Sequence, residues 1–133
     1  MTSIIDTSVV VKWIVDENAS DRAQDLIGSD LLAPDLLKAE LANALWKKVM
    51  RGQAVALQIA AGYSVALASI SFVPASPLSE RALAIALELM HPVYDCYFLA
   101  LSEATGFPIV TADGRLMARC VRTAWSRRLT ALG

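Results

Sequence analysis

Four acidic residues fall at positions where a merely solvated acid would be unusual: Asp6, Glu40, Asp95 and Asp113. Two of them come just after apolar runs that are typical of buried strands, Ser3–Ile5 and Phe107–Thr111. In open α/β sheets, ligands bind outside the carboxyl ends of the strands. If both strands are central and parallel, the carboxylates that follow them emerge at the same edge of the sheet.

The other two acids are expected on helices, at or beside the apolar face. On the helix expected over 34–50, Glu40 falls about 40° from Ala44 and so borders the apolar stripe. On the helix expected from Val93 to Thr105, Asp95 lies in the first turn, on the side of the apolar residues. An acid on such a face usually pairs with another group or has a functional role.

Each acid also has a simpler interpretation. Asp6 and Asp95 could be only helix caps, Asp113 only a turn residue, and Glu40 only a half-exposed charge beside the core. Two like charges about 4 Å apart repel by roughly 4 kcal/mol at an effective dielectric near 20. If the four acids do cluster, a divalent cation is the natural counter-charge. All-oxygen ligation favours Mg²⁺, with Mn²⁺ as the alternative.

The chain contains few of the residues that other catalytic mechanisms require. His91 is the single histidine and precedes Pro92 at a helix break, where a structural role is expected. A nuclease mechanism with a histidine acid–base pair is therefore excluded. The two cysteines, Cys96 and Cys120, form no zinc or disulfide pattern, and Cys96 is expected to be a small buried residue. With no signal peptide, we expect a cytoplasmic protein.

Short apolar strands alternate with helices, which predicts an α/β fold with a mostly parallel, buried sheet. The expected strands cover residues 3–5, 31–33, 71–73, 107–111 and 128–132. The expected helices cover residues 9–15, 20–27, 34–50, 53–69, 78–90 and 93–105, and a short one after 113. Thr7 or Ser8 is expected to cap the first helix, and Pro34 to open the third. The length of 133 residues fits a single domain over 1–133.

The charge of the chain is unevenly distributed. The net charge is −1, yet residues 1–35 hold seven acids and two bases. Residues 114–133 hold no acid and five arginines: Arg115, Arg119, Arg122, Arg127 and Arg128. An acidic end and a basic end suit a site that holds a metal beside a polyanion. These arginines could equally do no more than solvate the surface.

One neutral stretch could be mistaken for a membrane span. Residues 52–79 contain no charged residue, and this stretch is long enough to cross a bilayer. Polar residues and two prolines interrupt it, so we expect a buried or interface helix and no membrane segment.

The acidic positions and their surroundings resemble the PIN domain, in particular the VapC-type toxins of bacterial and archaeal toxin–antitoxin modules. Four segments carry the resemblance: Ile4-Ile5-Asp6-Thr7-Ser8-Val9, Pro34-Asp35-Leu36 through Glu40-Leu41-Ala42-Asn43-Ala44-Leu45, Tyr94-Asp95-Cys96-Tyr97-Phe98-Leu99-Ala100-Leu101-Ser102, and Val110-Thr111-Ala112-Asp113-Gly114-Arg115-Leu116. Cys96, where alanine is usual, and Gly114 depart from the common pattern. The resemblance implies a three-layer α/β/α sandwich with a mostly parallel central sheet.

The resemblance also implies a metal-dependent endoribonuclease that serves as the toxin of a type II system. Asp6, Glu40, Asp95 and Asp113 match the family's acidic quartet, with Glu40 reaching the metal directly or through water. Thr7 or Ser8 and Thr111 match hydroxyl positions that support metal-bound water or substrate. The implied partners are a VapB-type antitoxin, RNA and a second copy in a homodimer.

From these expectations we derive roles for the remaining residues. Arg115, Arg119 and the later arginines are expected to guide the RNA backbone. Trp13 and Trp46 are expected in the core, with an antitoxin groove as the alternative. The neutral helix is a candidate dimer face.

Two other functions compete with the nuclease. A PIN-like module could bind nucleic acid only in complex with its antitoxin. A response-regulator receiver domain would need a mid-chain aspartate and a late lysine. No acid lies between Glu40 and Glu80, and no lysine follows Lys48.

Overall fold

Five short strands form one sheet in which every neighbouring pair is parallel, in the order β3-β2-β1-β4-β5. The computed structural model describes residues 1–133, and its strands are β1 (Ser3–Ile5), β2 (Leu31–Pro34), β3 (Ser71–Val73), β4 (Ile109–Thr111) and β5 (Leu129–Ala131). Ile4 and Ile5 on the central strand are fully buried. A parallel sheet covered on both faces needs such continuous apolar strands. The predicted α/β class is therefore confirmed, with a sheet that is parallel throughout.

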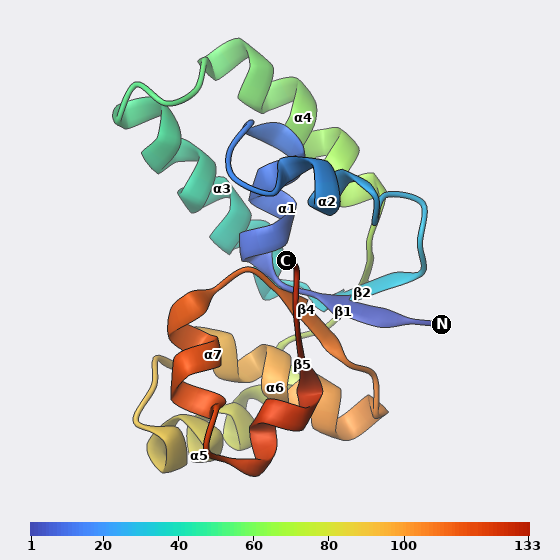
Figure 1. Cartoon of the computed structure of the whole chain (residues 1–133), viewed down its shortest axis with the longest axis vertical. Coiled ribbons are helices and arrows are strands. Elements are labelled where there is room, and N and C mark those ends of the chain that lie inside the picture. The colour runs from blue at the N-terminus through green and yellow to red at the C-terminus, as the bar shows by residue number, and fades with distance from the viewer.

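Helices cover both faces of the sheet, so the domain has three layers. In Figure 1, α1 to α4 lie above the sheet and α5 to α7 below it. The helices are α1 (Thr7–Ile14), α2 (Ser20–Gln24), α3 (Leu36–Met50), α4 (Ala56–Ala68), α5 (Ser79–Leu89), α6 (Val93–Thr105) and α7 (Gly114–Cys120). Two 3₁₀ turns are η1 (Ser76–Leu78) and η2 (Ala124–Arg128).

The strand order creates a crevice at the carboxyl end of the sheet. The central strand β1 pairs with β2 on one side and β4 on the other. After β1 the chain enters α1 in one outer layer, and after β4 it enters α7 in the opposite layer (Figure 1). Chains that leave neighbouring strands in opposite directions open a binding crevice between them. Asp6 and Asp113 stand at its two sides.

The expected opening of the third helix at Pro34 is wrong. Pro34 is the last residue of β2 and pairs with Val73 of β3. The Asp35 N–H donates to the Val73 carbonyl oxygen over 2.8 Å. Because the chain is still bonded to β3 at this point, α3 begins only at Leu36.

Three other helix boundaries differ from the expectation by two residues or more. The first helix begins at Thr7, so that Asp6 and not Thr7 or Ser8 takes the cap position. The second helix ends at Gln24, before turns that lead to Gly28. The helix expected from 53 begins at Ala56, because Gly52, at φ +70°, first reverses the chain after α3.

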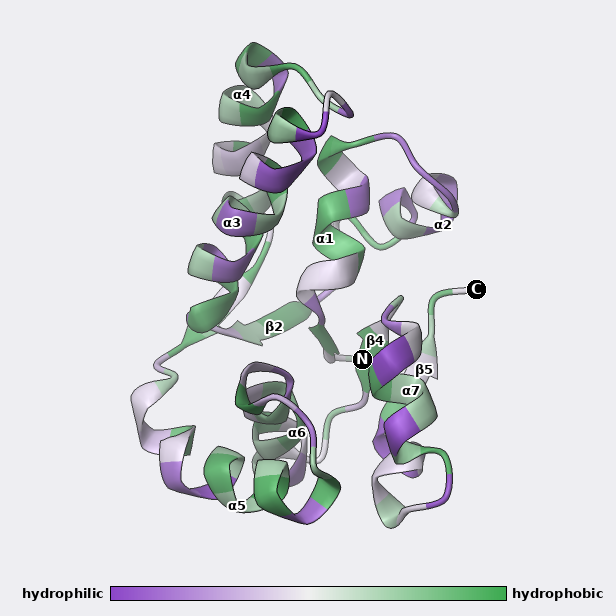
Figure 2. Ribbon diagram, turned by 90° about the vertical axis from the view of Figure 1, so that its left-hand side faces the viewer, coloured by the Kyte–Doolittle hydropathy of each residue, from purple (hydrophilic) through white to green (hydrophobic).

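The neutral helix α4 lies on the outside of the domain. Ala66 is its single buried residue, whereas Leu57 and Val65 are well exposed. Figure 2 shows this helix largely in the green of hydrophobic residues. No single helix is long and apolar enough to cross a membrane, and the η1–α5 segment with α6 reaches that length only as a pair bent by 114°.

Candidate active site

The four acidic side chains line one cavity of about 520 Å³ at the carboxyl edge of the sheet. They come from four different places: the end of β1, the second turn of α3, the first turn of α6 and the start of α7. Thr7, Ser8 and Tyr94 also line this cavity. The fold thus gathers residues that are up to 107 positions apart in the chain (6 to 113).

Asp6 is the most deeply placed of the four, with 3% of its surface exposed. It occupies the cap position of α1 but makes no capping hydrogen bond. Its Oδ2 instead accepts from the Ser8 hydroxyl at 2.5 Å and the Thr111 hydroxyl at 2.9 Å. Burial raises the pKa of Asp6 to about 6, and the charges of Asp95 and Asp113 add to this rise. The hydrogen bonds from the two hydroxyls lower the pKa and offset only part of it. The cap interpretation of Asp6 is therefore wrong.

The same hydroxyls tie the ends of β1 and β4 together. Ser8 Oγ accepts from the Ala112 N–H at 3.0 Å, and Thr111 Oγ1 accepts from the Asp113 N–H at 3.0 Å. Each hydroxyl therefore accepts a hydrogen bond from a backbone N–H and donates one to Asp6. This arrangement fixes the orientation of the buried carboxylate.

Glu40 faces the cavity from α3 and is half-buried. Its Oε1 accepts from the Thr7 hydroxyl at 2.9 Å. Burial, followed by the charges of the other three acids, raises the pKa of Glu40 to about 7 even though the Thr7 bond opposes the rise. The position of Glu40 at the border of the apolar face of α3 therefore places its carboxylate in the cavity.

Asp95 is held by a residue that was expected to be only structural. Its Oδ2 lies 2.6 Å from His91 Nε2, and the imidazole is 8% exposed. Burial raises the pKa of Asp95, and the bond to His91 partly offsets that rise. The cap of α6 is Pro92, so the cap interpretation of Asp95 is wrong. The spacing of four residues was a signal for this pair, but the break at Pro92 concealed it.

Asp113 combines a structural role with a place in the cavity. Its Oδ1 accepts from the N–H groups of Arg115 at 2.9 Å and Leu116 at 3.2 Å, which caps α7. The turn interpretation is therefore right for one oxygen. The other, Oδ2, makes no hydrogen bond with the protein and remains for a ligand.

The donor set suits a hard, hydrated cation. No three acidic, histidine or cysteine side chains lie close enough to form a ready-made cage for one ion. Mg²⁺ commonly binds through one or two carboxylates and keeps several waters, so an open, all-oxygen site of this kind fits it. The raised pKa values of Asp6 and Glu40 are typical of buried carboxylates whose charges are not compensated.

The five C-terminal arginines separate into two groups. Arg115, Arg119 and Arg122 line a cavity of about 890 Å³ that also includes Asp95 and Asp113. It therefore continues from the acidic cavity. Arg127 and Arg128 line a different cavity around Trp125 and Glu103, which contains none of the four acids.

The remaining candidates have mixed outcomes. Cys96 is fully buried, as expected, and burial raises its pKa to about 12, which keeps the thiol protonated. Trp46 is 57% exposed, so its expected place in the core is wrong. Trp13 is half-buried and donates its indole N–H to the Ala23 carbonyl at 2.6 Å. It lines an apolar cavity of about 400 Å³ between α1 and α4.

Comparison with known proteins gives relatives that match almost end to end. "Ribonuclease VapC3" of Pyrobaculum aerophilum is 29% identical over 124 residues, which cover 87% of this chain and 92% of that protein. The crystal structure of PAE2754 from the same organism has a TM-score of 0.75 at 22% identity and covers 99% of this chain and 92% of its own. A toxin–antitoxin complex from Klebsiella pneumoniae has a TM-score of 0.68 at 14% identity, with 98% of both chains covered. The two structures share the fold of this chain.

A family comparison covers the sheet and the acidic cavity together. The PIN domain model matches residues 3–121, which include all four acids and the strands β1 to β4. The resemblance first drawn from four short segments is thereby confirmed over most of the sequence. The chain belongs to the PIN domain family.

Proposed function

We propose that this protein is a Mg²⁺-dependent endoribonuclease that acts as the toxin of a type II toxin–antitoxin system. The observation that carries the proposal is the acidic cavity, where four carboxylates meet at the carboxyl edge of the sheet. Support for RNA as the substrate comes from the relative named Ribonuclease VapC3. Support for the toxin role comes from the toxin–antitoxin complex with the same fold.

In the proposed site, Asp6, Asp95 and Asp113 would hold one or two hydrated cations between them, and Glu40 would bind directly or through water. When bound, a divalent cation lowers the pKa of a water and neutralises charge on the phosphate during in-line attack. The chain's own hydroxyls have a supporting task. Ser8 and Thr111 hold Asp6, and Thr7 holds Glu40, so that each carboxylate keeps one fixed orientation.

A histidine acid–base mechanism is not proposed. The single imidazole, that of His91, is bonded to Asp95 and has no second histidine to work with. Arg115 and Arg119 are proposed to bind the RNA backbone, because both line the cavity that adjoins the acids.

We further propose a VapB-type antitoxin and a second copy of the chain as partners. The apolar cavity between α1 and α4, beside Trp13, is the proposed antitoxin surface, and the exposed part of α4 outside that cavity, which includes Leu57, is the proposed dimer surface. A cytoplasmic location remains a prediction from the sequence.

The test is cleavage of total RNA by the free protein in Mg²⁺ and in chelator, with the cleavage ends mapped. Wild type is expected to cut in Mg²⁺ only, and Asp6→Asn in neither condition. Asp25→Asn is the matched control, because Asp25 is exposed and bonds to no side chain. Undiminished cleavage by Asp6→Asn, in a preparation free of contaminating nuclease, would overturn the assignment.

A further inference from the structure

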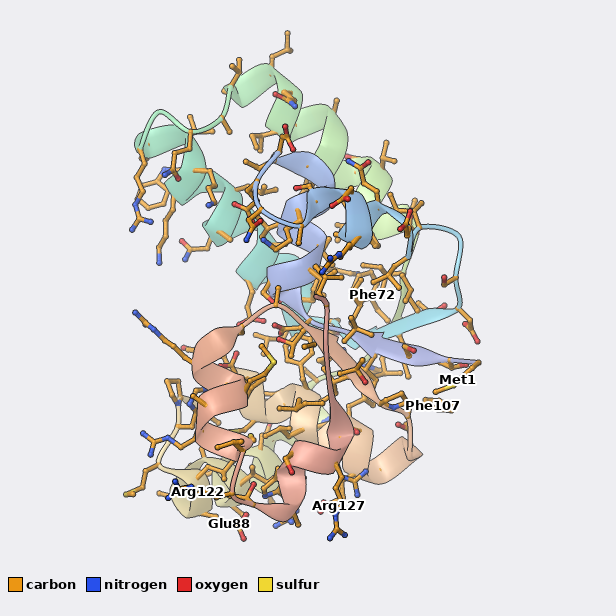
Figure 3. The ribbon with its side chains drawn as sticks, in the orientation of Figure 1. Met1, Phe72, Glu88, Phe107, Arg122 and Arg127 are labelled. Carbon is orange, nitrogen blue, oxygen red and sulfur yellow. The ribbon has the colours of Figure 1, made fainter.

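The single histidine of the chain makes a close contact with one of the four acids. Its Nε2 lies 2.6 Å from Asp95 Oδ2, and the side chains of His91 and Asp95 are 8% and 21% exposed. No arginine or lysine forms an ion pair with Asp95, although Arg115 and Arg122 line the same cavity as His91. Figure 3 shows Arg122 on the lower layer of the domain, which also contains α5, α6 and the turn between them. His91 is therefore the one side chain that holds this carboxylate.

The backbone between α5 and α6 brings the imidazole to the acid. Met90 adopts a left-handed conformation at φ 52°, which is uncommon for residues other than glycine. Met90 ends α5, and the N–H of His91 donates back to the Ala86 carbonyl oxygen over 3.2 Å. Pro92 then caps α6, which begins at Val93. The histidine is thus anchored to one helix while its ring bonds to the first turn of the next.

Each of the other three acids is oriented by donors of its own. Hydroxyls donate to Asp6 and to Glu40, and two backbone N–H groups donate to Asp113. Asp95 has neither kind of donor, and its Oδ1 makes no hydrogen bond with the protein. The imidazole therefore does for Asp95 what hydroxyls and N–H groups do for the other acids.

We propose that His91 is a positioning residue, whose Nε2–H donates to Oδ2 of Asp95 and leaves Oδ1 for the cation. The inference rests on the proposed function, in which Asp95 binds the metal. Groups that hold metal ligands typically change metal affinity 10- to 100-fold when they are removed. A bond that served only to join α5 to α6 would instead contribute to folding stability and leave metal affinity unchanged.

The first experiment is calorimetric titration with Mn²⁺, without RNA, of the wild-type protein and three variants. His91→Gln places an amide N–H₂ at about the reach of Nε2, whereas His91→Asn ends at about the reach of Nδ1, which does not contact Asp95. His91→Leu keeps the bulk and has no donor. The Mn²⁺ affinity is expected to fall about 10- to 100-fold for His91→Leu and His91→Asn, and to stay within about 3-fold of wild type for His91→Gln.

Thermal unfolding of all four proteins in chelator separates metal affinity from folding. Unchanged or higher Mn²⁺ affinity in His91→Leu would overturn the positioning role, even where that variant melts at a lower temperature. Equal losses of affinity in all three variants would also overturn it, because the amide of His91→Gln would then fail to replace the imidazole donor. If His91→Leu does not fold, the comparison of His91→Asn with His91→Gln carries the same test.

The second experiment observes the imidazole itself. Because His91 is the only histidine, its ring signals are identified directly in protein without a histidine tag. Long-range ¹H–¹⁵N spectra of the metal-free protein are expected to show a proton on Nε2, and Mg²⁺ is expected to shift the ring nitrogen signals. A ring without a proton on Nε2 would overturn the proposal, because it has no proton to donate to Asp95. Ring signals that stay unchanged at saturating Mg²⁺ would overturn it as well.

Failure of this inference is distinguishable from failure of the proposed function. If wild type and all His91 variants bind Mn²⁺ equally well, the positioning role is lost and the metal site remains. If wild type binds no Mn²⁺, the metal site of the proposed function is lost, and the inference is lost with it.

Discussion

Replacing Asp6 with asparagine should stabilise the metal-free protein while abolishing cleavage. Asp6 is 3% exposed, and its pKa is raised from 3.8 to about 6, chiefly by burial. A carboxyl whose pKa is higher in the folded state favours folding at low pH. That contribution to stability is lost as the pH rises from about 4 to above 6. Asparagine has a similar shape, can accept from both hydroxyls, and carries no charge.

The size of the effect follows from the same pKa. A rise from 3.8 to about 6 corresponds to at most about 3 kcal/mol of lost stability at pH 8. For a chain of this length, 1 kcal/mol moves the Tm by about 3 °C, so Asp6→Asn should melt up to about 10 °C higher. The carbonyl of asparagine bonds the hydroxyls more weakly than a carboxylate does, which makes this figure an upper limit.

The assay is thermal unfolding at pH 4 and pH 8 in chelator, followed by a repeat at pH 8 with Mg²⁺. Asp6→Asn should exceed wild type at pH 8 and match it at pH 4, and Mg²⁺ should raise the Tm of wild type more than that of the variant. Asp25→Asn should stay within about 0.5 kcal/mol of wild type throughout. A variant that is less stable than wild type at pH 8 would refute the reasoning that Asp6 is a buried, uncompensated charge.

Substitutions at Glu40, Thr111 and Gly62 test other contacts of the site and of the helix packing. Because burial raises the pKa of Glu40 to about 7 and a ligand must be deprotonated, Mn²⁺ affinity measured by calorimetry should rise between pH 6 and pH 8, and Glu40→Gln should flatten this rise. Thr111→Val removes one bond to Asp6 and leaves a backbone N–H unpaired, so urea unfolding should show a loss of about 1–3 kcal/mol. Gly62→Ala would place a Cβ 2.9 Å from Ile14 Cγ2, so it should destabilise the packing of α1 on α4 by about 1 kcal/mol in urea unfolding. In an Ile14→Ala background the same change should stabilise the protein, because alanine favours the helix interior over glycine by about 0.5–1 kcal/mol.

The sequence predicted the site best where the pattern was local. Asp6 and Asp113 follow buried strands, and parallel strands bring their carboxyl ends to one edge, so their meeting could be anticipated. Glu40 was signalled by its place at the border of an apolar stripe. The period of a strand or a helix, together with a parallel sheet, is enough to place these three acids.

The rest of the site depends on backbone geometry that cannot be predicted from the types of the residues. The left-handed turn at Met90 carries His91 to Asp95, and methionine is a rare residue for that conformation. The η2 turn takes Arg127 and Arg128 away from the acids, although they follow Arg122 closely in the chain. Pro34 remained in a strand because the pairing with β3 extends one residue farther than the proline pattern indicates.

The hydroxyls illustrate a further limit. Thr7 and Ser8 stand where capping residues are common, yet both are turned toward carboxylates. A cap and a carboxylate partner are equally consistent with the sequence. Contacts with α3 and with the end of β4, which lie far away in the sequence, determine that the hydroxyls bond to carboxylates and do not cap the helix.

The most direct test of the acidic cavity is the position of a bound cation. Crystals of this protein soaked in Mn²⁺ should give an anomalous difference peak coordinated by carboxylate oxygens of Asp6, Asp95 or Asp113, and Asp6→Asn crystals should lose or weaken it. A peak that lies only elsewhere on the molecule, or none in the cavity at a Mn²⁺ concentration that supports cleavage, would contradict the assignment.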